Sequence, residues 1–178
     1  RYGCLDWAPT YLRDAQGYDI KQAGWAYFAY EFAAIPGTLI CGWLSDRLFN
    51  GRRALPTIIF MALVAGFICL YWLFIDNLTV VTVSLIGIGF FIYGPVALTG
   101  VQALNLVPKN AAGTAAGFVG LFGYLLGDAV CSKILVGGIA VGSSWDNAML
   151  SVAVGALIGV FLCALLIRSE QKLAKANA

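Results

Sequence analysis

Five long apolar segments follow one another along the chain, and short links between them hold most of the charged residues. About 20 apolar residues are enough to cross the hydrocarbon core of a bilayer as a helix. Apolar residues make up 61% of the sequence and charged residues only 11%, whereas a soluble domain would scatter its charges along helix faces. The pattern predicts an all-α, polytopic membrane protein with helices over residues 23–44, 56–75, 79–107, 111–140 and 148–167.

A sixth apolar segment, residues 2–12, opens the chain and is too short to cross a membrane. At 1.5 Å per residue it reaches only about 16 Å, against a hydrocarbon core of about 30 Å. The sequence also begins without Met and without a signal peptide. We therefore expect the 178 residues to be a fragment that begins inside a helix, with part of the protein missing upstream.

The basic residues of the links are distributed unequally between the two sides of the predicted bundle. One side holds only Arg13 and Lys21. Because Lys and Arg are retained in the cytoplasm, the richer side and the C-terminus are predicted to be cytoplasmic. The net charge of +2 follows from this bias and does not indicate a nucleic-acid partner. The richer side holds Arg47, Arg52, Arg53, Lys109, Arg168, Lys172 and Lys175.

The residue types that perform covalent chemistry are scarce. The chain has no His, and its five Cys all lie inside apolar segments without close pairing, as small packing residues do. No nucleophile–base pair and no cluster of metal ligands can be found in the sequence. We expect neither an enzyme, nor a cofactor, nor a metal site, nor a disulfide.

A stripe of glycines runs along the segment 111–140. Small residues at helical spacing let helices approach closely in a membrane. The stripe therefore predicts close helix packing. It consists of Gly113, Gly117, Gly120, Gly123 and Gly127.

The link at residues 42–54 reads GWLSDRLFNGRRA and concentrates opposite charges between glycines. It resembles the signature loop of major facilitator transporters, which joins the second and third helices of each six-helix half. The resemblance implies that residues 1–178 form one half of a transporter, a six-helix bundle with a truncated first helix. The residues that carry it are Gly42, Asp46, Arg47, Gly51, Arg52 and Arg53.

Several ionisable residues lie inside the apolar segments, where burying charge is costly and usually serves a function. The helical rise places Arg1 and Glu31 deep in the membrane, and Asp128 and Lys133 lie mid-segment. A transporter places its substrate site at this depth. Arg1 is the candidate anion ligand, since guanidinium stays charged and can hold two phosphate oxygens. The alternative is that Arg1 snorkels or pairs permanently with a carboxylate.

The carboxylates lead to separate expectations. Asp6 lies roughly 140° round the helix from Arg1 and should face another helix. Glu31 would repel an anion, so it either balances a basic residue or takes up a proton. Asp128 and Lys133 are five positions apart, too far round an ideal helix to pair. Each of these two should find its partner on another element.

Four tyrosines accompany these charges. Tyr27 shares a helix face with Glu31, and Tyr30 lies beside them. Tyr93 and Tyr124 lie in other segments, and each is able to donate an O–H to a phosphate oxygen. Tyr93 and Tyr124 are candidate substrate ligands, and the alternative is that these two are core tyrosines with an ordinary partner.

Four longer strings carry a more specific resemblance over nearly the whole chain. They closely resemble the second half of the bacterial organophosphate:phosphate antiporters, and among these the glycerol-3-phosphate transporters. The resemblance implies that residues 1–178 are the C-terminal half-domain, helices seven to twelve, and that the N-terminal half is missing. The resemblance implies that Arg1 is one of two phosphate-binding arginines. It also implies that Asp6 and Glu31 pair with lysines of the missing half, and that Tyr93 and Tyr124 line the cavity. The strings are RYGCLDWAPTYL (1–12), WAYFAYEFAAIPGTLICGWLSD (25–46), IYGPVALTG (92–100) and LVPKNAAGTAAGFVGLFGYL (106–125).

One segment departs from the glycerol-3-phosphate pattern. GDAVCSK, residues 127–133, contains Asp128 and Lys133, which have no charged counterpart in that subfamily. The hexose-phosphate relatives carry an acid and a lysine here, and in them the pair is linked to substrate choice. The segment therefore bears on which organic phosphate is preferred.

The resemblance implies a monomeric transporter of the bacterial inner membrane that works by alternating access. It would exchange an organic phosphate, with glycerol-3-phosphate as the first choice, for inorganic phosphate. The alternatives are a hexose-phosphate or phosphoglycerate antiporter, a transporter-like membrane sensor of sugar phosphates, and a transporter of non-phosphorylated solutes. The expected partners are these small molecules, the lipid bilayer and the missing half.

Overall fold

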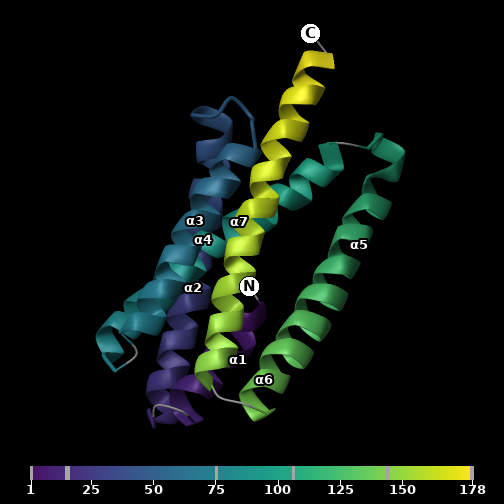
Figure 1. The fold of residues 1–178 in the computed structure, drawn as a ribbon. Coiled ribbons are helices and arrows are strands. Elements are labelled where there is room, and N and C mark those ends of the chain that lie inside the picture. The colour runs from purple at the N-terminus through teal and green to yellow at the C-terminus, as the bar shows by residue number, and fades with distance from the viewer. Residues whose placement is uncertain (1, 15–16, 75, 106, 143–144, 177–178) are drawn as a thin grey trace.

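The computed structural model describes residues 2–14, 17–74, 76–105, 107–142 and 145–176, and every regular element within them is helical (Figure 1). The all-α prediction is confirmed, and a helix covers each apolar segment. The elements α5, η2 and α6 run on as one long helix. The elements are α1 (Tyr2–Asp14), α2 (Ile20–Arg47), α3 (Ala54–Leu73), α4 (Leu78–Asn105), η1 (Lys109–Ala111), α5 (Ala112–Phe122), η2 (Gly123–Val136), α6 (Gly137–Gly142) and α7 (Trp145–Ala176).

Three helices in the described part of the chain are long and apolar enough to cross a membrane. They cover Ala54–Leu73, Leu78–Asn105 and Lys109–Ala140. A shorter apolar stretch, Leu150–Leu165, lies within α7. The 28-residue α2 is not in this group, since Glu31 and its neighbouring tyrosines interrupt the apolar sequence. Length and composition thus support membrane-spanning helices, and α2 is the most polar of the long ones.

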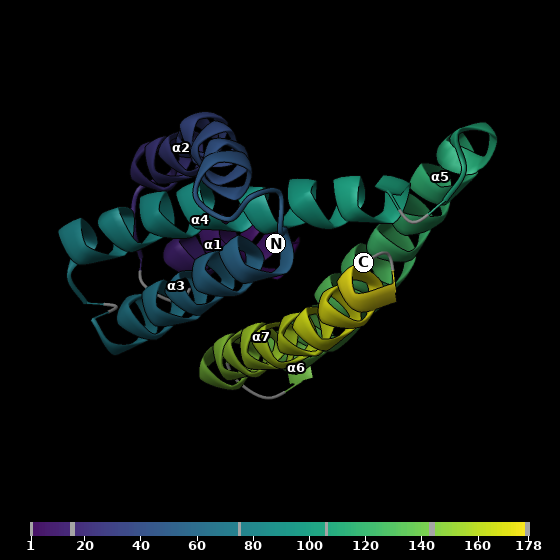
Figure 2. The same cartoon turned by 90° about the horizontal axis from the view of Figure 1, so that it is seen from above.

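The helices α2 and α4 lie against each other in direct backbone contact (Figure 2). A Cβ atom added to Gly37 of α2 would overlap the carbonyl of Phe90 on α4, and one added to Gly89 of α4 would overlap the carbonyl of Tyr30 on α2. Only glycine permits backbones to approach this closely. These two glycines therefore fix both the distance and the register of the α2–α4 crossing. Because α4 also packs along α3, the crossing belongs to the central part of the bundle.

The glycine stripe does not make the close packing predicted for it within the described residues. At four of its positions nothing lies within 4 Å of an added Cβ, and Gly127 meets only the ring of Tyr2, at 3.3 Å. Figure 1 shows α5 diverging from the helices α2 to α4. The open positions are Gly113, Gly117, Gly120 and Gly123. The close approaches occur instead at the α2–α4 crossing, which the sequence analysis did not single out.

The signature loop forms a tight turn between α2 and α3. Asn50 and Gly51 both have positive φ, 50° and 76°. The N–H of Gly51 donates to the carbonyl of Ser45 at 3.0 Å and closes the end of α2. A left-handed residue just beyond the last turn is a common way to end a helix, and glycine adopts it without a Cβ penalty. The polar residues Asp46, Arg47 and Arg52 of the loop are exposed.

Substitution of Gly51 by alanine is expected to destabilise the protein by about 1 kcal/mol, because a Cβ disfavours the left-handed conformation. The measurement is thermal unfolding of the full-length protein in detergent. Gly42→Ala is the matched control in the same loop motif, since Gly42 is helical and has nothing within 4 Å of an added Cβ. Equal stability of the two variants would argue against strain at Gly51.

Candidate functional site

The proposed anion ligand, Arg1, lies outside the described residues. The other candidate residues fall into two groups. The α2–α4 pair consists of Glu31 and Tyr93. The α1–η2 cluster contains Asp6, Asp128 and Lys133, and Tyr124 lies on the same π-helix, η2.

In the α2–α4 pair, the hydroxyl of Tyr93 donates to the carboxylate of Glu31. It lies 2.9 Å from Oε1 and 2.9 Å from Oε2, so its single proton is shared by the two oxygens. Hydrogen bonds to an ionised acceptor are the strong ones. Within the described residues no Lys or Arg forms an ion pair with Glu31. A phenol thus satisfies the carboxylate here, and the expected basic partner is not among these residues.

The α2–α4 crossing explains why Glu31 and Tyr93 meet. Glu31 directly follows Tyr30, whose carbonyl touches Gly89, and Tyr93 lies one helical turn beyond Gly89. The buried ring of Tyr30 packs edge-on against Tyr93 with 6.2 Å between centroids. Tyr27 stacks on Tyr30 at 6.5 Å. The patch of carboxylate and phenols predicted on α2 is therefore present, and it extends to Tyr93 of α4.

In the α1–η2 cluster, Ser132 joins two neighbouring residues of α1. Its Oγ donates to Oδ2 of Asp6 at 2.6 Å, and its carbonyl accepts a bond from Nε1 of Trp7 at 3.0 Å. The prediction that Asp6 faces another helix is confirmed. Ser132 was missed because one serine in an apolar segment carries no periodic signal. Its only signal was its place beside Lys133.

Asp128 and Lys133 pair with each other, so the prediction that each needs a partner on another element is wrong. Nζ of Lys133 lies 3.0 Å from Oδ2 of Asp128. The cause is local backbone geometry, because η2 is a π-helix. A π-helix forms i→i+5 hydrogen bonds, so residues five apart fall on the same face. The estimate of their separation assumed the tighter α-helical turn.

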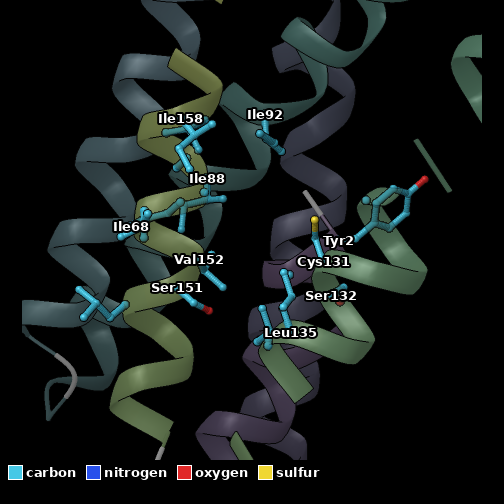
Figure 3. A pocket seen from close by; sticks show the side chains of 18 of the residues that line it. Tyr2, Ile68, Ile88, Ile92, Cys131, Ser132, Leu135, Ser151, Val152 and Ile158 are labelled. Atoms are coloured by element: carbon cyan, nitrogen blue, oxygen red, sulfur yellow. The ribbon is translucent and has the colours of Figure 1, made fainter. Parts of the chain in front are cut away.

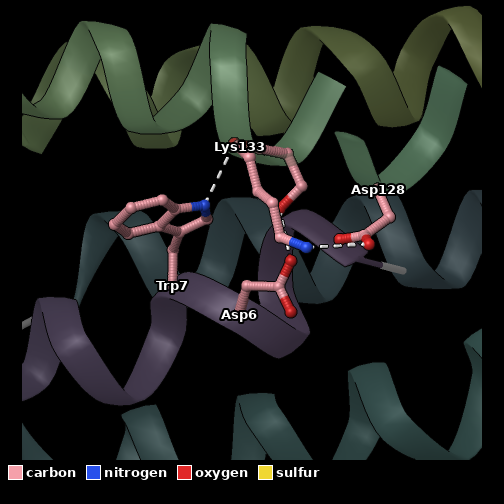
Figure 4. Close-up of polar contacts among 5 residues, drawn as sticks. Asp6, Trp7, Asp128 and Lys133 are labelled. Atoms are coloured by element: carbon pink, nitrogen blue, oxygen red, sulfur yellow. Dashed lines mark hydrogen bonds and ion pairs between the residues drawn. The ribbon is translucent and has the colours of Figure 1, made fainter. Parts of the chain in front are cut away.

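Figure 4 shows the side chains of Asp6, Asp128 and Lys133 pointing toward one another. The cluster contains two carboxylates and one ammonium group, so it carries one more negative than positive charge when all three are ionised. The ammonium group is already paired with Asp128. This cluster alone therefore does not offer an anion site, and a phosphate would need a further cation, the role assigned to Arg1.

Tyr124 lies apart from Tyr93. Its ring packs against Tyr2 of α1 with 5.6 Å between centroids, and its side chain is 60% exposed. The structure thus places the two candidate tyrosines in different groups, Tyr93 with Glu31 and Tyr124 beside the α1–η2 cluster.

A cavity of about 690 Å³ lies beside the α1–η2 cluster. Figure 3 shows Tyr2, Cys131, Ser132 and Leu135 along one wall, with residues of α3, α4 and α7 opposite. The opposite wall is mostly aliphatic and includes Ile68, Ile88, Ile92, Val152 and Ile158, with Ser151 among them. No charged residue lines the cavity in the described part of the chain, so these walls alone would not neutralise a phosphate.

Comparison with known proteins agrees with this architecture. The family model of the Major Facilitator Superfamily matches residues 2–130. The chain is 46% identical over 166 residues to a glycerol-3-phosphate transporter of Bacillus subtilis (strain 168), covering 93% of this chain and 37% of that protein. It is 42% identical over 188 residues to a glycerol-3-phosphate transporter of Haemophilus influenzae, covering 97% and 39%.

A hexose-6-phosphate:phosphate antiporter of Salmonella typhimurium is 34% identical over 190 residues, covering 99% of this chain and 40% of that protein. The chain thus spans 37% to 40% of the length of these relatives. The family model covers well over half of the chain and includes α1 to α5. Of the candidate residues in the two groups, only Lys133 lies outside the matched range 2–130. The chain belongs to the Major Facilitator Superfamily.

Proposed function

We propose that the chain is the C-terminal six-helix half of a secondary transporter that exchanges an organic phosphate ester for inorganic phosphate. Glycerol-3-phosphate is the proposed ester, and the bacterial inner membrane, with the C-terminus in the cytoplasm, is the proposed location. The observation that carries this proposal is the similarity of nearly the whole chain to glycerol-3-phosphate transporters. The chain spans 37% and 39% of the length of these two relatives, so the rest of the full-length protein would supply the remaining helices.

In this proposal Arg1 binds the phosphate together with a basic residue of the upstream half. Exchange has a physical rationale, because an empty site would leave guanidinium groups unneutralised in a low dielectric. The crossing of the membrane is then favourable only with an anion bound. Asp6 and Glu31 would balance cations of the opposite half, and the signature loop would lie on the cytoplasmic side.

The test is counterflow in proteoliposomes that contain the full-length protein. Vesicles loaded with inorganic phosphate should take up radiolabelled glycerol-3-phosphate, and external phosphate should compete with it. A membrane sensor would bind the ester without sustained uptake. A transporter of non-phosphorylated solutes would show no competition by phosphate. Either of these two results would overturn the proposed exchange.

A hexose-6-phosphate is the second candidate substrate, and one observation favours it. The ion pair between Lys133 and Asp128 occupies the segment that departs from the glycerol-3-phosphate pattern. Competition of glucose-6-phosphate and glycerol-3-phosphate for uptake into the same vesicles ranks the two esters directly.

Replacing Tyr93 by phenylalanine is expected to lower phosphate exchange by about 10-fold, which corresponds to the lower end of the about 1.5–3 kcal/mol that one hydrogen bond to a charged group contributes. The phenol has one proton, and it holds the carboxylate of Glu31 in the structure. The measurement is the initial rate of phosphate exchange in proteoliposomes.

Glu31→Gln supplies the partner experiment, since the amide still accepts a bond from Tyr93 but carries no charge. If the two residues act as one unit, the double variant should be no slower than the slower single variant. Multiplicative losses would show that Tyr93 works independently of Glu31, for instance directly on the substrate.

A further inference from the structure

Ser132 is one of the residues that join η2 to α1. It is 1% exposed, and its two long-range hydrogen bonds reach the adjacent residues Asp6 and Trp7. Two bonds to consecutive residues fix both the height and the rotation of η2 against α1. Lys133 follows Ser132 directly in the sequence, so this attachment lies beside the ion pair of Lys133 with Asp128.

The carbonyl of Ser132 accepts two hydrogen bonds. One comes from the indole of Trp7, and the other from the backbone N–H of Gly137 at the end of the π-helix. Gly137 also makes room for the indole, because an added Cβ would lie 2.6 Å from the Trp7 ring. The backbone carbonyl of Ser132 and the indole of Trp7 therefore hold this residue in position without its hydroxyl. The hydroxyl is thus able to form a hydrogen bond of its own.

The hydroxyl of Ser132 binds the carboxylate of Asp6. A serine within a helix often returns its hydroxyl to a carbonyl of its own helix, yet here the hydroxyl donates across to Oδ2 of Asp6 at 2.6 Å. This distance is typical of an O–H bonded to an ionised carboxylate. The bond turns Asp6 toward η2, while Lys133 forms its ion pair with Asp128. Without the hydroxyl, Asp6 would be free to compete for the same ammonium group.

We propose that Ser132 is a positioning residue of the transport cycle, whose hydroxyl holds Asp6 in place and keeps Lys133 on Asp128. This inference rests on the proposed function, in which Asp6 balances a cation of the opposite half. If Asp6 formed an ion pair with Lys133, it would no longer balance the cation of the opposite half. The step affected is the conformational change of the loaded carrier, and substrate affinity is left unchanged.

Ser132→Ala removes the hydroxyl with the smallest change of volume. In proteoliposomes with the full-length transporter, we expect the maximal rate of inorganic phosphate exchange to fall by about 10-fold. The half-saturating phosphate concentration should change by less than about twofold, since the proposal gives Ser132 no contact with the phosphate and the slowed step follows binding. Ser132→Thr keeps the hydroxyl and should restore most of the rate. A wild-type rate in Ser132→Ala would overturn the inference.

Ser151→Ala is the matched control. Ser151 lines the same cavity, but its Oγ donates within its own helix α7, to the carbonyl of Ala148 at 2.6 Å. We expect this variant to exchange phosphate at the wild-type rate. An equal loss in both serine variants would point to general loosening of the cavity wall and would count against a specific role of Ser132.

A double-mutant cycle with Asp6→Ala, which removes the acceptor, decides whether Ser132 acts through Asp6. In this Asp6→Ala background, Ser132→Ala should cause little further loss of rate. Losses that multiply would overturn the inference.

If the wild-type protein exchanges no phosphate, the proposed function fails, and the contact itself is then judged by thermal unfolding of the same four proteins. Non-additive shifts of the unfolding midpoint would support an interaction between Ser132 and Asp6, and additive shifts would show that the two side chains do not interact.

Discussion

Alanine at Gly89 is expected to disrupt the packing of α2 on α4 and to sharply lower the yield of folded transporter. The added methyl group would overlap the carbonyl of Tyr30, and a backbone atom cannot move aside as a flexible side chain can. Overpacking of a tight core costs about 3 kcal/mol at the upper end of its usual range, which is a large part of the total stability of a protein. The measurements are the monodisperse fraction in detergent and the midpoint of thermal unfolding.

Gly66→Ala is the matched control for this effect. Gly66 lies inside α3, and nothing stands within 4 Å of an added Cβ. The same methyl group should therefore leave stability unchanged or slightly improved, because alanine favours the helix. If Gly89→Ala unfolds at the same temperature as Gly66→Ala, the crossing does not depend on a glycine at this position.

The positions of the helices follow from composition. Long apolar segments interrupted by charged links predict membrane helices, and each observed helix begins and ends close to the predicted boundaries. The largest extension occurs in α7, which continues to Ala176, because Glu, Lys, Ala and Leu beyond residue 167 are good helix formers. The turn between α2, which ends at Arg47, and α3, which begins at Ala54, likewise falls within the link predicted at residues 42–54.

The contacts between helices depend on information that no single segment contains. Glu31 and Tyr93 are 62 positions apart, and they meet only because two glycines bring α2 and α4 into backbone contact. The more conspicuous glycine stripe of α5 and η2 suggested close packing, yet most of its positions are open within the described residues. Spacing alone does not tell which glycines face another helix.

The α1–η2 cluster was misjudged for a different reason. The spacing of Asp128 and Lys133 was converted into an angle with 3.6 residues per turn, whereas η2 adopts the wider π-helix. π-Helices are rare, so no estimate from sequence would have assumed one. Ser132 was missed for another reason, because a single serine in an apolar segment has no periodicity and its partners Asp6 and Trp7 lie 126 and 125 positions away.

Lysine in place of Arg1 is expected to abolish phosphate exchange in proteoliposomes, with a loss of about 100-fold. The charge is kept, but lysine is a point charge and cannot supply the two parallel N–H donors that hold two phosphate oxygens at once. One lost hydrogen bond to a charged group costs about 1.5–3 kcal/mol, and the upper value corresponds to that loss. The measurement is exchange of radiolabelled phosphate by the full-length protein at equal reconstituted amounts.

Arg13→Lys is the matched control, since it makes the same substitution at the other end of α1. Nε of Arg13 lies 2.6 Å from Oδ1 of Asp14, and the arginine side chain is 55% exposed. The hydrogen bond from Arg13 lowers the pKa of the Asp14 carboxyl, but an exposed ion pair of this kind contributes little to stability. Arg13→Lys should therefore exchange phosphate at the wild-type rate. If Arg1→Lys does so as well, the phosphate does not depend on a guanidinium at this position, and another cation must be sought as its ligand.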